Sequence, residues 1–253
     1  MLFANLAARL AQARSDVCIL RDDPSPLIAS VEDAYKVQSD LIELANADVR
    51  GWKVTALTPA DQAKYGSTRP VAGPLLGPCV HPNPCKLALK QFIAPLIECE
   101  IAFVLGADLP PRERPYAHDE IAAAVMAVVP GIEVVDSRVA ASATELARLA
   151  DAMMNGAYVV GAPATAWRDL DFINLAVSFT ASHGERQSGS GARIPGGPFA
   201  AVVALANAQP LPGPGLRKGQ VITTGSCTPP VPLRAGDYVA AFGKLGQVRL
   251  SVG

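Results

Sequence analysis

The sequence predicts an α+β protein with a mixed, β-rich core and a small helical cap at its N-terminus. Residues 1–50 contain two stretches in which apolar side chains recur with helical spacing. After Gly51 the chain consists mainly of short runs of strand-forming residues, separated by glycine and proline. A length of 253 residues suffices for one sizeable core. We therefore expect the helical cap at residues 1–50 and the core at residues 51–253.

The cap is expected to hold two helices. The first covers residues 2–14, where Arg9 and Arg14 interrupt an apolar helical pattern. The second covers residues 31–48, because Ser30 suits the N-cap position and Asp33 follows three residues later. No basic region precedes an apolar block at the start of the chain, so we expect a mature cytoplasmic N-terminus.

The core is expected to alternate strands with a few helices. The expected strands are residues 52–57, 97–105, 132–135, 158–161, 175–181, 220–224, 238–242 and 247–252. The expected helices are residues 119–128, 140–154 and 198–207. Asn155 and Gly156 suit the end of the second of these helices, and Pro198 suits the first turn of the third.

Charge and hydropathy exclude two classes of partner. The net charge is −1 and the lysines and arginines are scattered, so the chain offers no positive stripe for a nucleic acid backbone. The longest apolar stretch, residues 121–135, is interrupted by Pro130, Gly131 and Glu133 and is too short to span a bilayer. We expect neither nucleic acid nor membrane as a partner.

The cysteines and histidines indicate neither a disulfide framework nor a histidine-based mechanism. Five cysteines, an odd number, occur without any Cys-x-x-Cys pair, which argues against a thiolate zinc site and favours a reducing compartment. The three histidines all lie in proline-rich or polar loop contexts typical of the surface: His81, His118 and His183.

Two glutamates separated by one residue are the most informative feature of the chain. Glu98 and Glu100 lie in an otherwise apolar strand-like run, so their side chains share one face. A third, Glu133, lies in a second such run. Buried like charges are costly unless a cation neutralises them, and carboxylate oxygens suit Mg²⁺ or Mn²⁺. The alternative is a half-exposed strand with solvated glutamates, and alternation alone does not separate the two.

Three further segments could face a ligand. Lys53 lies at the start of the first core strand and could hold an anionic substrate, although a lone strand lysine is usually solvated. The loop at residues 188–198 is rich in small residues, but its spacing fits no nucleotide-binding motif and instead predicts a close backbone approach. The Thr223–Ser226 segment offers hydroxyls and backbone N–H groups, or forms a polar turn.

Several of these stretches, taken in order, resemble one family. The matching motifs are Gly-Trp-Lys-Val (51–54), Ile-Glu-Cys-Glu-Ile-Ala-Phe-Val-Leu-Gly-Ala-Asp-Leu (97–109), Val-Pro-Gly-Ile-Glu-Val-Val-Asp-Ser-Arg (129–138), Gly-Ala-Tyr-Val-Val-Gly (156–161), Ser-Gly-Ser-Gly-Ala (188–192) and Leu-Arg-Ala-Gly-Asp (233–237). They resemble the 2-keto-4-pentenoate hydratase and 4-oxalocrotonate decarboxylase branch of the fumarylacetoacetate hydrolase superfamily, over nearly the full chain.

The resemblance implies a fold and a set of site residues. The fold would be a core of rolled mixed sheets that assembles into homodimers or larger rings. Glu98, Glu100 and Glu133 would be the Mg²⁺ or Mn²⁺ ligands, and Lys53 the active-site lysine. The substrate would lie near three further residues: Thr224, Gly225 and Ser190.

The chain also departs from the pattern of this branch. Many of its hydratases have an aspartate where this chain has Val71-Ala72, and a serine in the segment that here reads Met153-Met154-Asn155. The common Gly-His-Pro is Gly196-Gly197-Pro198. The metal centre is thus retained while polar groups that handle water are missing.

The leading hypothesis is a divalent-metal-dependent lyase for a short unsaturated 2-oxo acid. A hydratase would convert 2-hydroxypenta-2,4-dienoate to 4-hydroxy-2-oxopentanoate, with the cation stabilising an enolate. The nearest alternative is a 4-oxalocrotonate decarboxylase, which needs the same site. A non-catalytic relative that retains metal binding is a third possibility. Hydrolysis of an acylpyruvate is disfavoured, because no histidine is placed to activate water.

Overall fold

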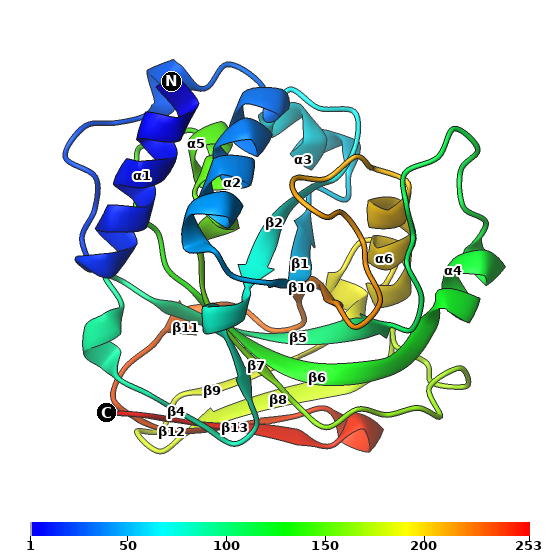
Figure 1. Ribbon diagram of the computed structural model, residues 1–253. Coiled ribbons are helices and arrows are strands. Elements are labelled where there is room, and N and C mark those ends of the chain that lie inside the picture. The colour runs from blue at the N-terminus through cyan, green and yellow to red at the C-terminus, as the bar shows by residue number, and fades with distance from the viewer. Residues whose placement is uncertain (1) are drawn as a thin grey trace.

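Two mixed β-sheets form the core, and a group of helices that includes α1, α2 and α5 lies above the first sheet in Figure 1. The computed structural model describes residues 2–253. The first sheet has the order β2 (Val71–Leu76), β1 (Val49–Thr55), β10 (Val221–Ser226), β5 (Leu96–Leu105), β6 (Val125–Val135), β7 (Asn155–Val160) and β3 (Val80–Pro82), with β11 (Val231–Pro232) also paired to β5. The second has the order β4 (Cys85–Leu87), β13 (Gln247–Val252), β12 (Gly236–Ala241), β8 (Ala176–Ala181) and β9 (Arg186–Ser190).

The helices are short, and 3₁₀ turns join several of the strands. The α-helices are α1 (Leu2–Ser15), α2 (Val31–Ala45), α3 (Pro59–Lys64), α4 (His118–Ala124), α5 (Glu145–Ala150) and α6 (Pro198–Ala206). The 3₁₀ helices are η1 (Ser25–Leu27), η2 (Gly77–Cys79), η3 (Leu89–Gln91), η4 (Ala152–Met154), η5 (Gly191–Arg193) and η6 (Gly243–Leu245). Among residues 2–253, no helix has both the length and the apolar character needed to cross a membrane.

Strand β5 separates the apolar core from the site. Its odd-numbered side chains, such as Ile101 and Phe103, are buried in the cluster that includes Phe179 and Tyr238 of the second sheet. Its even-numbered side chains point to the opposite face, because side chains alternate along a strand. Ala102 on that face packs in a separate cluster with Leu75, Val129, Tyr158 and Val221. The expected alternation therefore places Glu98 and Glu100 on the inner face of the curled first sheet.

Helices α1, α2 and α5 pack together through their own cluster of buried side chains, which includes Leu10, Val37 and Leu149. The hydroxyl of Ser30 accepts a hydrogen bond from the backbone N–H of Asp33 at 3.1 Å, which confirms the expected N-cap. The second helix ends at Ala45, earlier than expected, because Asn46 adopts a left-handed conformation with φ 43°.

Two of the expected core helices are wrong in extent. Residues 125–128 belong to β6, not to a helix, because they pair with β5 as far as Leu105. The helix expected at 140–154 covers only Glu145–Ala150, with Thr144 as its N-cap. It cannot continue because Ala152, Met153 and Met154 all have positive φ. Helix α3 and strands β2, β3, β4, β9 and β11 were not expected.

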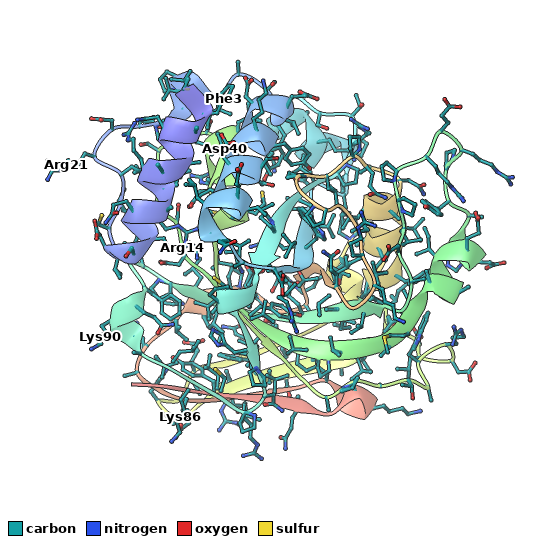
Figure 2. The ribbon with its side chains drawn as sticks, in the orientation of Figure 1. Phe3, Arg14, Arg21, Asp40, Lys86 and Lys90 are labelled. Carbon is teal, nitrogen blue, oxygen red and sulfur yellow. The ribbon has the colours of Figure 1, made fainter. Side chains whose placement is uncertain are left out.

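Several basic side chains point away from the molecule. In Figure 2, Arg21 points outward beside α1, while Lys86 and Lys90 point outward near the second sheet.

Candidate metal centre

Three glutamates meet at the pairing of β5 with β6. Glu98 lies directly opposite Glu133 in this antiparallel pair, and Glu100 lies opposite Gly131. One carboxylate oxygen from each glutamate lies within 4.8 Å of the others. Glu133 and Glu100 are 0% and 2% exposed, whereas Glu98 is half-buried, so solvent reaches the cluster from the side of Glu98.

The cluster carries more negative charge than its surroundings neutralise. Burial, together with the negative charge of Glu133, raises the pKa of Glu98 to about 7. Burial, together with Glu133 and Glu98, raises the pKa of Glu100 well above its usual range. Three carboxylates in so small a space therefore favour either bound protons or a bound cation.

Lys53 supplies the nearest positive charge. Its Nζ lies 2.6 Å from Oε1 of Glu133, and both side chains are buried. Burial alone would lower the pKa of Lys53, but the attraction of Glu133, Glu98 and Glu100 raises it instead. The ammonium thus stays charged and offsets one of the three carboxylates.

The donor set fits a hard divalent cation. Oε2 of Glu133 is buried and, within residues 2–253, has no hydrogen-bond partner, so a ligand-binding oxygen is left free. All three donors are carboxylate oxygens, the ligand type that Mg²⁺ and Mn²⁺ prefer. A divalent cation together with Lys53 would balance the three negative charges.

Strand β10 brings the Thr224–Gly225 segment against the cluster. Its pairing with β5 shifts register between Thr223 and Ser226, which turns the backbone toward Glu100. The N–H of Gly225 donates to Oε2 of Glu100 at 3.3 Å. Gly225 has φ 109°, a conformation that side-chain-bearing residues rarely adopt. The hydroxyl of Thr224 donates to the backbone oxygen of Ile101 at 2.6 Å, so this residue fixes the strand beside the cluster.

The loop that contains Ser190 makes the close backbone approach expected from its small residues. A Cβ on Gly189 would lie 1.8 Å from the backbone oxygen of Cys227, so only glycine fits there. Ser190 ends β9, and its hydroxyl accepts a hydrogen bond from the N–H of Ala192 at 3.3 Å. Ser190 therefore caps η5, the turn that carries Arg193.

A cavity of about 180 Å³ opens between these segments. Its walls come from the ends of β1 and β10, from α3 and from η5: Val54, Thr55, Ala56, Leu57, Asp61, Arg193, Ile194, Pro195, Thr224, Gly225 and Ser226. The volume is below the range typical of drug-sized ligands, so the cavity suits a small molecule. The sequence did not single out Arg193, an exposed residue, because nothing in a loop of small residues indicates which side chain borders a cavity.

Tyr158 is a second residue of the site that the sequence did not single out. It lies opposite Glu133 on β7 and is fully buried. A Cβ on Gly131 would lie 2.0 Å from its hydroxyl, so Gly131 leaves the space that the phenol fills. The hydroxyl has no hydrogen-bond partner within the described residues 2–253. Burial raises the pKa of Tyr158 well above its ordinary value, and the charges of Glu100 and Glu133 add to this effect.

Two of the three departures from the family pattern lie in apolar or glycine-rich surroundings. Val71 and Ala72 are buried on β2, beside β1. The N–H of Ala72 donates to the hydroxyl of Tyr35 at 3.0 Å, so α2 holds this strand through its backbone. Gly197 has φ 87° at the start of α6 and provides no side-chain cap.

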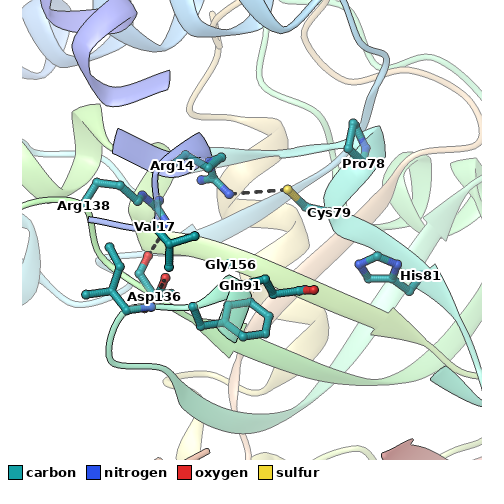
Figure 3. A pocket seen from close by; sticks show the side chains of 11 residues that line it. Arg14, Val17, Pro78, Cys79, His81, Gln91, Asp136, Arg138 and Gly156 are labelled. Carbon is teal, nitrogen blue, oxygen red and sulfur yellow. Dashed lines mark hydrogen bonds between the residues drawn. The ribbon is translucent and has the colours of Figure 1, made fainter. Parts of the chain in front are cut away.

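Another cavity, of about 270 Å³, lies between α1 and β3 (Figure 3). Arg14 and Asp136, which line it, are already engaged. Arg14 donates to the backbone oxygen of Asn155 at 2.6 Å and to Sγ of Cys79 at 3.5 Å. Asp136 accepts from the N–H groups of Ile93 and Ala94. The contacts of Arg14 join α1 to the core.

The sequence is similar to one protein family and to several characterised relatives. The sequence model of the fumarylacetoacetate (FAA) hydrolase C-terminal domain matches residues 83–253. The 2-keto-4-pentenoate hydratase of Burkholderia vietnamiensis is 32% identical over 254 aligned residues, covering 97% of this chain and 95% of that protein. A protein of the same name from Paraburkholderia phymatum is 30% identical, covering 98% and 96%.

Comparison with solved structures points to the same relatives. The 4-oxalocrotonate decarboxylase from Pseudomonas putida G7, complexed with magnesium and adipate, has a TM-score of 0.85 and 25% identity, covering 99% of this chain and 97% of that one. A structure of the same enzyme with calcium and acetate has a TM-score of 0.84. The fold, the length of the match and the identity to the hydratases lead to one conclusion: the chain belongs to the fumarylacetoacetate hydrolase family.

Proposed function

We propose that this protein is a divalent-metal-dependent lyase that acts on a short unsaturated 2-oxo acid, in the manner of a 2-keto-4-pentenoate hydratase. The observation that carries the proposal is the meeting of three glutamates on one sheet face, with the charged Lys53 beside them. The relatives named 2-keto-4-pentenoate hydratase match nearly the whole chain and therefore support hydration of 2-hydroxypenta-2,4-dienoate.

Glu98, Glu100 and Glu133 are the proposed metal ligands, and the cation is proposed to be Mg²⁺ or Mn²⁺. When bound, such a cation would polarise the carboxylate and 2-oxo oxygens of the substrate and stabilise negative charge on them. Glu133 is held by Lys53 and Glu100 by the N–H of Gly225, so both carboxylates are fixed before a cation arrives.

Lys53 is the proposed catalytic residue. Its ammonium is buried and charged, so it would stabilise negative charge that develops on the substrate oxygen nearest to Glu133. Gly225, Thr224 and Ser190 are proposed to form the substrate side of the site, with Thr224 and Ser190 acting by fixing the backbone at the cavity wall. The apolar wall residues would exclude water from the carbon chain of the substrate.

Decarboxylation of 4-oxalocrotonate is the second candidate. The decarboxylase from Pseudomonas putida G7 matches the structure over almost its full length and binds magnesium together with adipate, a dicarboxylate. Val71, Ala72 and Gly197 provide no polar side chain where hydratases of the branch carry one, which favours a reaction that requires no added water. We further propose a homo-oligomer in the cytoplasm, consistent with the resemblance.

The two activities can be separated by ultraviolet absorbance. Chelator-treated protein is mixed with freshly generated 2-hydroxypenta-2,4-dienoate, or with 4-oxalocrotonate, before and after addition of Mg²⁺ or Mn²⁺. Metal-dependent loss of the dienoate with formation of 4-hydroxy-2-oxopentanoate is the expected result. Turnover of 4-oxalocrotonate alone, with release of CO₂, would make decarboxylation the reaction. Absence of turnover with both substrates, in protein that binds the metal, would contradict the proposed lyase function.

A further inference from the structure

Tyr158 carries a buried hydrogen-bond donor that the proposed function leaves unused. Its side chain is 0% exposed, and its hydroxyl has no hydrogen-bond partner among residues 2–253. A buried hydroxyl without a partner costs free energy, because it loses its contacts with water and gains none in return. Such groups are rare in folded proteins, so this one requires an explanation.

The register of the first sheet locates this hydroxyl between Glu133 and Glu100. Tyr158 lies directly opposite Glu133 in the pair of β6 with β7, so the two side chains are neighbours on one face. The ring extends over Gly131, since a Cβ on Gly131 would lie 2.0 Å from the hydroxyl. Gly131 in turn lies opposite Glu100 in the pair of β5 with β6. The hydroxyl therefore takes the position that a side chain of residue 131 would have, beside Glu100.

Glu100 is a buried carboxylate with donors on one side only. It is 2% exposed, and the N–H of Gly225 donates to it at 3.3 Å, which is long for such a bond. This N–H comes from β10, which also brings the hydroxyl of Thr223 to the same face. On the other side of β5, Gly131 has no side chain, and the hydroxyl of Tyr158 fills that position. A donor without an acceptor thus lies beside an acceptor that needs a further donor.

We propose that Tyr158 is a positioning residue of the metal centre, whose phenol donates a hydrogen bond to the carboxylate of Glu100 and holds it in the orientation that binds a cation. A hydrogen bond from a phenol to a carboxylate is charge-assisted and belongs to the stronger ones in proteins. The terminal torsion of a glutamate is broad, so its carboxylate can turn toward the phenol without a change in the rest of the side chain.

The burial of Tyr158 decides how it acts. Because its hydroxyl is closed off from solvent, it acts through Glu100 and does not touch the substrate. Hydrogen bonds of this kind to metal ligands account for about 10- to 100-fold in metal affinity. The inference rests on the proposed function, because it assumes that Glu100 is a metal ligand.

The test compares wild-type protein with Tyr158→Phe, which removes the hydroxyl and keeps the ring. Tyr238→Phe is the matched control, because Tyr238 is also buried but lies on β12 of the second sheet. There its hydroxyl donates to the backbone oxygen of Arg234 at 2.7 Å and accepts from the N–H of the same residue at 2.8 Å. Calorimetric titration with Mn²⁺, without substrate, measures the affinity, and chemical denaturation of the metal-free proteins measures their stability.

We expect Tyr158→Phe to weaken Mn²⁺ binding by about 10- to 100-fold, because Glu100 loses a donor. The metal-free variant should be at least as stable as wild-type protein, since the hydroxyl that it lacks has no partner in the structure. Tyr238→Phe should give the opposite result: unchanged Mn²⁺ binding and lower stability, because two hydrogen bonds to Arg234 are lost.

Two results would overturn the inference. Wild-type affinity for Mn²⁺ in Tyr158→Phe would mean that the phenol holds no metal ligand. Weaker binding together with a clear loss of metal-free stability would mean that the hydroxyl supports the packing of the sheet and not the orientation of Glu100. The comparison requires no turnover: if wild-type protein binds Mn²⁺ but converts neither oxo acid, the proposed function fails, while the affinities still decide the role of Tyr158.

Discussion

At the scale of single residues, Glu133 is the centre of the site. It is fully buried, faces Glu98 across the strand pair, contacts Lys53, and neighbours Tyr158 on the other side. A buried carboxylate of this kind is stable only with a cation beside it, since desolvation disfavours its charged form. Its contact with Lys53 satisfies one oxygen and leaves the other for a metal.

Replacing Glu133 by glutamine tests this role with little change of volume. We expect Glu133→Gln to weaken Mn²⁺ binding by at least about 100-fold, because a neutral amide replaces a charged ligand and leaves Lys53 unpaired. Calorimetric titration with Mn²⁺ measures the change. Glu113→Gln, at an exposed loop position, is the matched control and should bind as wild type does. Wild-type affinity in Glu133→Gln would contradict its role as a ligand.

The sequence singled out the three glutamates of the candidate site, but not the residues around them. The period of two in a strand puts Glu98 and Glu100 on one face whatever the strand pairs with. The meeting with Glu133 depends on the register of β5 with β6, which no local pattern specifies. Tyr158 and Arg193 reach the site only through pairing and loop closure between distant segments, so local spacing could not indicate them.

At the scale of elements, the parallel pairing of β1 with β10 delivers Lys53 to the glutamates. Lys53 lies opposite Thr223 in this pair, and Thr223 lies opposite Ala102 of β5. The two strands approach closely at Gly51, where a Cβ would lie 2.1 Å from the backbone oxygen of Val221. The indole N–H of Trp52 donates to the backbone oxygen of Gly215 at 3.1 Å and holds the same strand from the other side.

Gly51→Ala should therefore disturb this pairing. We expect a loss of unfolding free energy of about 1 to 3 kcal/mol, because the added methyl group meets backbone rather than a flexible side chain. Chemical denaturation measures the loss, and activity should fall as Lys53 is displaced. Gly77→Ala is the control, since the nearest atom to its added Cβ lies at 3.5 Å, an ordinary contact. Equal stability of the two variants would show that β1 tolerates a side chain at this position.

The elements also show where local pattern and tertiary structure disagree. Residues 125–128 fit a helix by composition, yet they extend β6 because β5 offers a partner for them. Helix α6 was predicted almost in full, because Pro198 and the apolar run that follows are local signals. The short strands β3, β4 and β11 have two or three residues each, too few to form a pattern that sequence reasoning can detect.

At the scale of the whole molecule, metal binding should stabilise the fold. The three glutamates come from two strands of the first sheet, β5 and β6, so the site exists only in the folded state. With Mn²⁺ at about 100 times its dissociation constant, linkage predicts about 2.7 kcal/mol of added stability. For a chain of 253 residues this corresponds to a rise in Tm of roughly 5 to 10 °C.

Thermal unfolding with and without Mn²⁺ measures this rise. Glu133→Gln should show little of it under the same conditions, since the variant lacks one of the three proposed ligands. The same rise in the variant would mean that Mn²⁺ stabilises the molecule from another site.

The central claim is that Glu98, Glu100 and Glu133 together hold the divalent cation, and anomalous diffraction tests it most directly. Crystals soaked in Mn²⁺ should show an anomalous peak among the three carboxylates, on the inner face of the first sheet and beside the cavity that Arg193 lines. A peak elsewhere, or no peak at saturating Mn²⁺, would contradict the claim and remove the basis for the proposed lyase chemistry.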